Sequence, residues 1–275
     1  MDTSSPWRGT ISRRERRSVA HSSNSRLPAA SGSSARPRTQ LTCGATMPEW
    51  PRRLSSLVAM TCFASASLLF CAPAQAASMP DPVLFVHGWS GASWNWSLMI
   101  SDFRAAGYPG GRLEAISYNT EQSNAETAEE VRDAVNRLRA RTGSDKVDII
   151  SHSMGGLSTR YYLKKLGGVE AVDDWVSIGG PNHGTYTASL CAPFLPSCRE
   201  MAVGSAFLSD LNGGDETPGD VHYSTLRSWC DEIINPDTST KLYGATNINV
   251  GCVGHAALLV DYDVSLAAQN LVKAQ

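Results

Sequence analysis

A serine between two patterned segments is the first feature of the sequence that could do chemistry. The hexapeptide Ser151-His-Ser-Met-Gly-Gly156 lies directly between an apolar run at 147–150 and a segment of helical periodicity at 154–166. At such a strand–turn–helix junction the serine is held above the edge of a sheet, and its neighbours must be small because strand and helix pack closely. Ser151 takes the first small position, where glycine is commoner, and Gly155 takes the second. This context predicts Ser153 as a nucleophile rather than a solvent-facing turn serine.

The base for this serine is expected near the C-terminus. A serine hydroxyl is a poor nucleophile near neutral pH and needs a general base, and after a serine of this kind the acid and the histidine follow in chain order. Three histidines lie downstream. His255 follows the last predicted strand and precedes the final helix, so it is the expected base. His183 is expected to be a hydrogen-bonding loop residue, and His222, inside a strand pattern, a structural one.

The acid is expected after the strand that precedes the histidine loop. That strand is predicted over residues 221–226, and Asp231 follows it. Asp237 is the second choice. The predicted catalytic set is therefore Ser153, His255 and Asp231. Three further acids precede this strand and are expected to be solvated loop residues: Asp210, Asp215 and Asp220.

Attack by a serine also requires N–H donors for the oxyanion that forms. The backbone N–H of Met154, directly after the nucleophile, is the first expected donor. The second is expected from the loop after the first strand, residues 87–91. In that loop Gly88 lets the backbone approach the serine, and the N–H of Trp89 is the natural donor.

Further imidazole and indole side chains flank these motifs. His87 ends the first strand and is expected to be a structural hydrogen-bonding residue. His152 is expected to point away from the nucleophile's face and to be packed. Trp89, Trp94 and Trp96 could line an acyl pocket, although aromatic residues after a first strand serve at least as often in helix-to-sheet packing.

Apolar runs alternate with helix-period segments from residue 82 onward. This pattern is typical of an α/β fold, in which a mostly parallel sheet is covered by helices on both faces. The Pro- and Gly-rich residues 186–220 are expected to form a long excursion that covers a site. Strands are predicted at 83–86, 113–118, 147–150, 175–178, 221–226 and 246–250, and helices at 96–103, from a capping box at 123–126, at 154–166 and at 264–272.

Composition excludes several classes of protein. The chain has 275 residues, 42% of them hydrophobic, with 24 Lys+Arg against 26 Asp+Glu. Residues 1–53 contain ten of the Arg and only three acids, so the remainder is acidic. An acidic body argues against a nucleic-acid partner. No apolar stretch after the N-terminal one is long enough to span a bilayer, which excludes a polytopic membrane protein.

Two N-terminal segments are expected to lie outside the folded domain. Residues 1–46, rich in Ser and Arg, are predicted to be disordered, or untranslated if synthesis starts at Met47 rather than Met1. Residues 47–76 have the parts of a secretory signal: a basic start, an apolar stretch over 54–70 and a small-x-small site ending at Ala76. Cleavage there would leave one compact domain, residues 77–275, of a secreted protein, and the sequence leaves the export route open.

Four of the seven cysteines lie in this predicted domain. An even number in an exported protein suggests two disulfides, out of three possible pairings. The expected pairs are Cys191–Cys198, which closes a small loop, and Cys230–Cys252, which would join the loop of the acid to the loop of the histidine. A zinc site is not expected, because no C-x-x-C or H-x-x-H pair occurs.

Four motifs follow one another along the chain: Pro82–Ala92, Ser151–Gly156, Gly179–Gly184 and Val253–Leu258. Together they resemble the small secreted bacterial triacylglycerol lipases, including the Bacillus lipase A type and the actinobacterial class 2 lipases. The resemblance begins at about residue 80 and reaches the C-terminus.

This resemblance implies a minimal α/β-hydrolase fold. It also implies Ser153 as nucleophile, Asp231 as acid, His255 as base, and the backbone amides of Trp89 and Met154 as oxyanion donors. The smallest members of that family have no true lid. This chain departs from them by the insertion around residues 186–220 and by its four cysteines, which leaves lid behaviour and chain-length preference open.

The leading hypothesis is a secreted triacylglycerol lipase or carboxylesterase that works through an acyl-enzyme on Ser153. Alternatives with the same triad are a polyester or cutin hydrolase and an acyltransferase. A peptidase would use the same chemistry, but nothing in the sequence indicates a peptide-binding groove. A non-catalytic secreted binding protein is disfavoured because all three triad residue types occur in the expected order.

No metal or organic cofactor is expected. The expected partners are an ester substrate and, transiently, a lipid interface, with the chain acting as a monomer.

Overall fold

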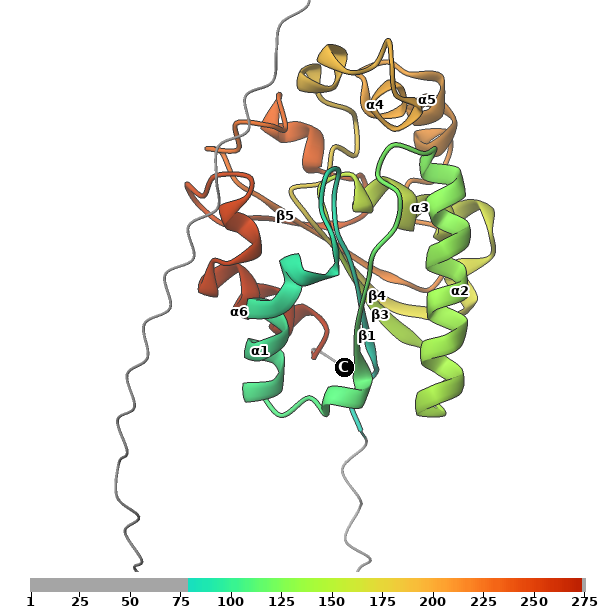
Figure 1. Ribbon diagram of the computed structural model, residues 1–275, viewed down its shortest axis with the longest axis vertical. Coiled ribbons are helices and arrows are strands. Elements are labelled where there is room, and N and C mark those ends of the chain that lie inside the picture. The colour runs from blue at the N-terminus through green and yellow to red at the C-terminus, as the bar shows by residue number, and fades with distance from the viewer. Residues whose placement is uncertain (1–78, 274–275) are drawn as a thin grey trace, which may run out of the picture. The chain divides into compact units, whose positions relative to one another are not determined.

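The computed structural model describes residues 79–273, which are coloured in Figure 1. The segments predicted as disordered (1–46) and as a secretory signal (47–76) lie outside the described residues. Within the described part of the chain, no helix is both long enough and apolar enough to cross a membrane.

One sheet of six parallel strands forms the centre of the domain, in the order β2-β1-β3-β4-β5-β6 (Figure 1). The first strand, Val-Leu-Phe-Val, is buried on both faces, as expected for a parallel sheet between two helical layers. The predicted α/β class is therefore confirmed. The strands are β1 (Val83–Val86), β2 (Leu113–Ile116), β3 (Val147–His152), β4 (Val172–Ile178), β5 (His222–Arg227) and β6 (Thr246–Asn249).

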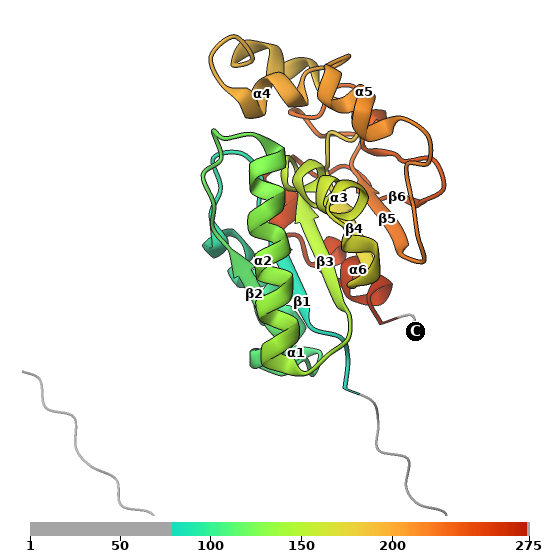
Figure 2. The ribbon, with the colours of Figure 1, turned by 90° about the vertical axis from the view of Figure 1, so that its right-hand side faces the viewer.

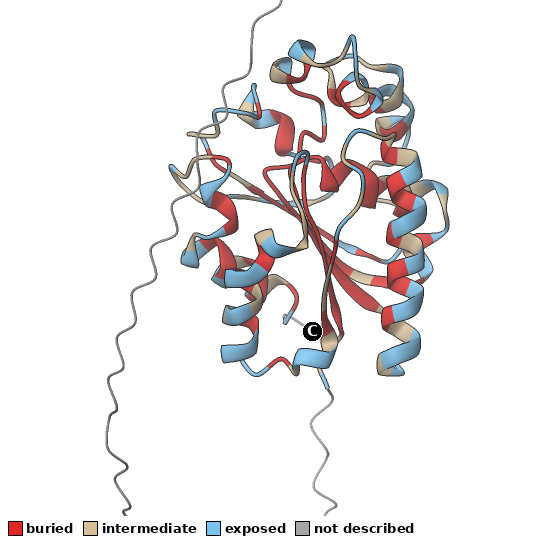
Figure 3. Ribbon diagram, viewed as in Figure 1, coloured by how far each residue is buried: buried red, intermediate tan, exposed pale blue. Residues whose placement is uncertain are grey.

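Helices cover the two faces of this sheet, as Figures 1 and 2 show. The helices α2 (Asn124–Thr142) and α3 (Gly155–Lys165) pack on one face, where Leu84 of β1 joins their apolar side chains. The helices α1 (Ser97–Ala105) and α6 (Tyr262–Leu271) pack on the other, where Phe85 lies. Figure 3 shows the buried residues in the strands and on the inward sides of these helices. Short 3-10 turns occupy Ser93–Trp96, Gly110–Arg112, Gly168–Glu170, Tyr186–Leu190, Asp237–Thr240 and Ala257–Leu259.

The segment 186–220 is an excursion above one end of the sheet, and it contains α4 (Pro196–Met201) and α5 (Ala206–Asn212) (Figure 2). Its apolar side chains form a cluster with Met154 and Leu157, at the start of α3. Glu200 anchors it to the N-terminus of α2, because its carboxylate accepts hydrogen bonds from Ser123 Oγ at 2.6 Å and from the backbone N–H of Asn124 at 2.6 Å. A carboxylate is favourable there because it meets unpaired N–H groups and the positive end of the helix dipole.

Element ends differ from the predicted ones by a few residues. β3 continues through His152, two residues past the predicted end, because its pairing with β4 persists as far as Ile178. β4 begins at Val172 rather than at residue 175, and α6 begins at Tyr262 because Asp261 caps its N-terminus. The capping box of Ser123 and Glu126 at the start of α2 is present as predicted.

Candidate active site

Ser153 occupies the turn between β3 and α3. Its backbone is in the left-handed region, with φ of 53°, which is uncommon for a residue with a side chain. The helix that follows approaches β1 so closely that a Cβ on Gly155 would lie 2.5 Å from the carbonyl oxygen of His87. Ser151, in the other small position, is fully buried and donates a hydrogen bond to the Val176 carbonyl at 3.2 Å. Strand, turn and helix therefore hold Ser153 at the carboxyl end of the sheet.

His255 connects this serine to an acid. Its Nε2 lies 2.9 Å from Ser153 Oγ, and its Nδ1 lies 2.8 Å from Oδ2 of Asp231. The three residues are contributed by the loops after β3, β5 and β6, whose carboxyl ends share one edge of the parallel sheet. Ser153 and His255 are only 7% and 8% exposed, so this hydrogen-bonded series is largely shielded from water. The structure brings together the three residues predicted as nucleophile, base and acid.

Backbone donors hold the carboxylate of Asp231 in place. Its Oδ1 accepts hydrogen bonds from the N–H groups of Ile233 at 2.9 Å and Ile234 at 2.8 Å, which leaves Oδ2 for the imidazole. The next residue, Glu232, accepts a hydrogen bond from the backbone N–H of His255 at 3.0 Å. The acid loop and the histidine loop are thus joined by this hydrogen bond from backbone to side chain as well as by the triad side chains.

A disulfide and a buried hydroxyl join the same two loops. Cys230 and Cys252 are bonded, as are Cys191 and Cys198, so both predicted pairings are present. Ser228 Oγ accepts a hydrogen bond from the N–H of Val253 at 2.9 Å, on the opposite loop. Neither Ser228 nor Glu232 stands out in the sequence, because their roles depend on two loops that meet only in the fold.

The loop after β1 lies directly against the serine. A Cβ on Gly88 would lie 2.6 Å from Ser153 Cβ and 3.2 Å from its Oγ, so only glycine fits at this position. In the described part of the chain, no protein acceptor takes the backbone N–H of Trp89 or of Met154. One of these N–H groups belongs to the loop that lies against Ser153 and the other to the residue directly after it, so both remain the predicted oxyanion donors.

Two of the flanking histidines are buried beneath this loop. His87 donates from Nδ1 to the Gly88 carbonyl at 2.8 Å and stacks on Tyr118 with ring centroids 4.2 Å apart, in agreement with its expected structural role. His152 is packed, as expected, but it does not point away from the site: it lies in the same small cavity as Ser153 and contacts the ring of His255. His152 is the last residue of β3, which continues two residues past its predicted end. In the sequence, the only sign that His152 lies at the site is its position directly before Ser153.

Two cavities meet at Ser153. The larger, of about 270 Å³, is mostly apolar; the smaller, of about 170 Å³, lies on the side of His255 and the 88–91 loop. Of the three tryptophans predicted as pocket candidates, only Trp89 lines these cavities; Trp96 is buried against Phe85, and Trp94 is exposed. The larger cavity is lined by Trp89, Ser153, Thr185, Thr187, Ala188, Leu190, Cys191, Met201, Ile233 and Ile234.

The remaining candidates lie elsewhere. His183 Nε2 contacts Glu216 at 2.9 Å, consistent with a hydrogen-bonding loop residue. His222 pairs with Asp174 at 3.6 Å at the start of β5, the opposite end of the sheet from Ser153.

Asp237, the second choice for the acid, forms an ion pair with Arg227. Among the loop acids, Asp210 pairs with Lys165, Asp215 caps a turn at Thr217, and Asp220 is exposed.

A parallel sheet with a serine on the turn after β3, followed by an acid and a histidine on later loops, defines an α/β-hydrolase. Residues 80–251 match the family model for lipase (class 2), and the chain belongs to this family.

Named relatives agree with this assignment. A triacylglycerol lipase of Pseudomonas fragi is 34% identical over 92 residues, which are 30% of this chain and 31% of the relative. Lipase B of Pseudozyma antarctica is 24% identical over 217 residues, 73% of this chain and 62% of the relative. The matches therefore span less than two thirds of the length of these relatives.

Solved structures show the same fold. A Bacillus licheniformis lipase in its mature form superposes with a TM-score of 0.62 at 18% identity, over 70% of this chain and 92% of that one. An Aspergillus fumigatus lipase B superposes with a TM-score of 0.61 at 23% identity, over 70% of this chain and 52% of that one.

Proposed function

We propose that this protein hydrolyses carboxylic esters of lipids through an acyl-enzyme on Ser153. The observation that carries the proposal is the unbroken series of hydrogen bonds from Asp231 through His255 to Ser153 beside an apolar cavity. The family and the named triacylglycerol lipases support lipid esters as the substrate class.

Acylation begins with attack of Ser153 Oγ on the ester carbonyl carbon while His255 Nε2 takes the hydroxyl proton. Asp231 orients the imidazole and stabilises its positive charge. The negative charge on the carbonyl oxygen is held by the N–H groups of Trp89 and Met154. The bond to the alcohol oxygen then breaks, and the alcohol leaves with the proton from His255.

Deacylation uses the same groups with water as the nucleophile. His255 takes a proton from the water that attacks the acyl carbon, and the acid is released as the proton returns to Ser153. The apolar cavity of about 270 Å³ is the proposed acyl site. The smaller cavity beside His255, where the leaving alcohol must collect its proton, is the proposed alcohol site.

Several apolar side chains at the mouth of the acyl cavity are exposed, among them Leu190 at 82%, Trp89 and Ile233. An exposed apolar rim favours contact with a lipid surface, so transient interfacial contact is part of the proposal. The segment 186–220, which supplies one wall of the cavity, is the proposed cover of the site.

Two disulfides favour a protein that is exported to an oxidising compartment, and we propose a secreted monomer.

The test compares the purified protein with its Ser153→Ala variant on nitrophenyl esters from acetyl to palmitoyl. The variant should lose about 10⁶-fold in turnover, as removal of a triad serine does. Activity that rises with acyl length, and with emulsified over soluble ester, is the expected result. Activity confined to short chains would instead indicate an esterase, and equal activity of the two proteins would refute the proposal.

A further inference from the structure

A cavity of about 460 Å³ lies at the end of the sheet opposite Ser153. Four carboxylates reach it from the N-terminal ends of three adjacent strands. Asp81 precedes β1, Asp148 is the second residue of β3, and Asp173 and Asp174 follow the first residue of β4. Parallel strands bring these ends together at one edge, just as they bring the triad together at the other. The lining residues are Met79, Pro80, Asp81, Asp148, Asp173, Asp174, Val272 and Lys273.

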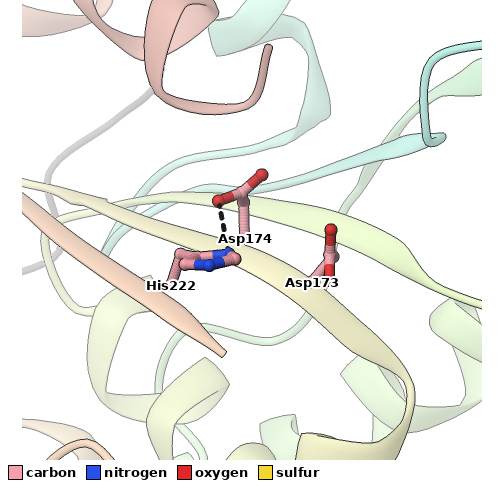
Figure 4. Close-up of side chains that lie close together, drawn as sticks. All are labelled: Asp173, Asp174 and His222. Carbon is pink, nitrogen blue, oxygen red and sulfur yellow. Dashed lines mark ion pairs between the residues drawn. The ribbon is translucent and has the colours of Figure 1, made fainter. Parts of the chain in front are cut away.

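An irregularity in the strand pairing concentrates the acids. Val147 pairs with Val172 and Ile149 with Trp175, so both Asp173 and Asp174 lie opposite Asp148. Such a bulge places two residues of one strand against one of its neighbour. The backbone N–H of Asp174 donates to Oδ1 of Asp148 at 3.3 Å. Figure 4 shows Asp173 and Asp174 on their strand, with Asp174 paired to His222 on the next strand.

Two buried oxygens, one in the lining of this cavity and one close to its acids, have no hydrogen-bond partner among the described residues. Asp148 is 1% exposed and lines the cavity, yet its Oδ2 receives no hydrogen bond from any described residue. The hydroxyl of Tyr108 is also buried without a partner among these residues. Burial raises the pKa of Tyr108, and the neighbouring Asp148, Asp174 and Asp81 raise it further. Buried polar atoms are almost always satisfied, so these two oxygens require an explanation.

The cations nearby leave the innermost acids without an ion pair. Lys146 Nζ lies 2.8 Å from Asp173, and Lys146 is not among the residues that line the cavity. Among the ion pairs of the described residues, none includes Asp81 or Asp148.

Two further basic residues near the cavity are engaged with other groups. Arg112 donates to the Pro80 carbonyl at 3.0 Å and to Ser144 Oγ at 2.8 Å. Lys273 lies over the ring of Tyr108, 5.6 Å from its centroid. Within the described residues, Asp81 and Asp148 are therefore clustered carboxylates without a direct counter-charge.

We propose that this cavity binds Ca²⁺, with Oδ2 of Asp148 as the innermost ligand and the carboxylates of Asp81 and Asp174 beside it. Ca²⁺ takes six to eight oxygen ligands in irregular geometry and accepts water among them, whereas Mg²⁺ demands a near-ideal octahedron. The donors are mainly carboxylates; the one imidazole nearby, His222, is mostly exposed and lies within 4.8 Å of the Asp173 and Asp174 oxygens. Zn²⁺ prefers nitrogen and sulfur ligands. Because the cavity is remote from Ser153, bound Ca²⁺ stabilises the fold rather than taking part in ester chemistry.

The test measures the thermal unfolding midpoint of the purified, chelator-treated protein as CaCl₂ is added to millimolar concentration. A ligand that binds only the folded state stabilises it, and at a hundredfold excess over Kd the midpoint should rise by about 5–10 °C. In Asp148→Asn the rise should disappear, while the midpoint without Ca²⁺ should not fall, because a neutral amide replaces a buried unpaired carboxylate. Asp263→Asn, an exposed acid in α6, is the control that keeps the full response.

A second variant keeps the proposal testable if Asp148→Asn fails to fold. Asp81→Asn, at the partly exposed edge of the cavity, should raise the Kd for Ca²⁺ by at least about tenfold, since it removes one of three charged ligands. Three results would overturn the proposal: no saturable rise in the wild type, an unchanged response in the two cavity variants, or a response to Zn²⁺ alone that His222→Asn abolishes.

Discussion

Nε2 of His152 donates a hydrogen bond to the backbone carbonyl of His255 at 3.1 Å, and the two imidazole rings lie 4.6 Å apart. Burial, and after it the neighbouring His255, lower the pKa of His152 to about 3. His152 is therefore neutral wherever the proposed base works. A neutral ring in this position supports the backbone of His255 without placing a second positive charge beside it.

This buried imidazole should make the protein less stable in acid. In the unfolded chain its pKa is near 6.5, so from there down to about pH 3 the unfolded state binds a proton that the folded state does not. The free energy of unfolding therefore falls as the pH is lowered through this window, in total by on the order of 5 kcal/mol. His152→Gln keeps an N–H donor and should flatten this part of the curve. Urea unfolding of both proteins between pH about 7 and about 4 measures the difference, and parallel curves would contradict it.

The choice of acid can be decided by a matched pair of variants. Asp231→Asn should lower kcat by about 10⁴-fold, because an amide cannot stabilise the imidazolium and favours the wrong tautomer. Asp237→Asn should leave kcat within a few-fold, since Asp237 pairs with Arg227 instead. Steady-state kinetics on one nitrophenyl ester compares them. The reverse order would move the assignment of the acid to Asp237.

Gly88→Ala should damage catalysis much more than stability. The added Cβ would lie 2.6 Å from Ser153 Cβ, so either the serine or the 87–91 loop must move. Displacing an oxyanion donor costs about 10²–10³-fold in kcat. Gly111→Ala is the control, because a Cβ there meets no heavy atom within 4 Å. Equal activity of the two variants would show that close approach of this loop is not needed.

The two disulfides should differ in their effect on activity. By loop entropy, Cys230–Cys252, with a separation of 22, contributes about 3 kcal/mol to stability, and Cys191–Cys198, with a separation of 7, about 2 kcal/mol. Replacing the first pair by Ser should also lower kcat, because it joins the loops that carry Asp231 and His255. Replacing the second should change the acyl-length profile, because Cys191 lines the acyl cavity. Thermal unfolding and ester kinetics on both variants test this, and unchanged melting curves would refute it.

Much of the fold could be predicted because its signals are local. The run Val83–Val86 between Pro82 and Gly88, and the capping box of Ser123 and Glu126, depend only on neighbouring residues, and the structure has both. Element ends were less predictable. The extra residues of β3 and β4 exist because each strand continues as long as its neighbour offers hydrogen bonds, which no local pattern reveals.

The candidate site divides in the same way. The turn that carries Ser153 is specified by a strand, a helix and the small residues between them. The pairing of Asp231 rather than Asp237 with His255 required an inference about strand order. The contact of His152 with His255 was missed, because the direction of a side chain at a strand end depends on where the strand stops.

Local periodicity and steric limits are enough to predict the serine on its strand–turn–helix junction, the chain order of serine, acid and histidine, and the α/β layering. The folded chain was needed to show that residues of the segment 186–220 line an apolar cavity beside Ser153. The fold was equally needed to show that Asp81, Asp148 and Asp174 lie together at the opposite edge of the sheet. The physical reason is that both arrangements depend on which strands are neighbours and in what register they pair, and these are set by packing between segments far apart in the chain.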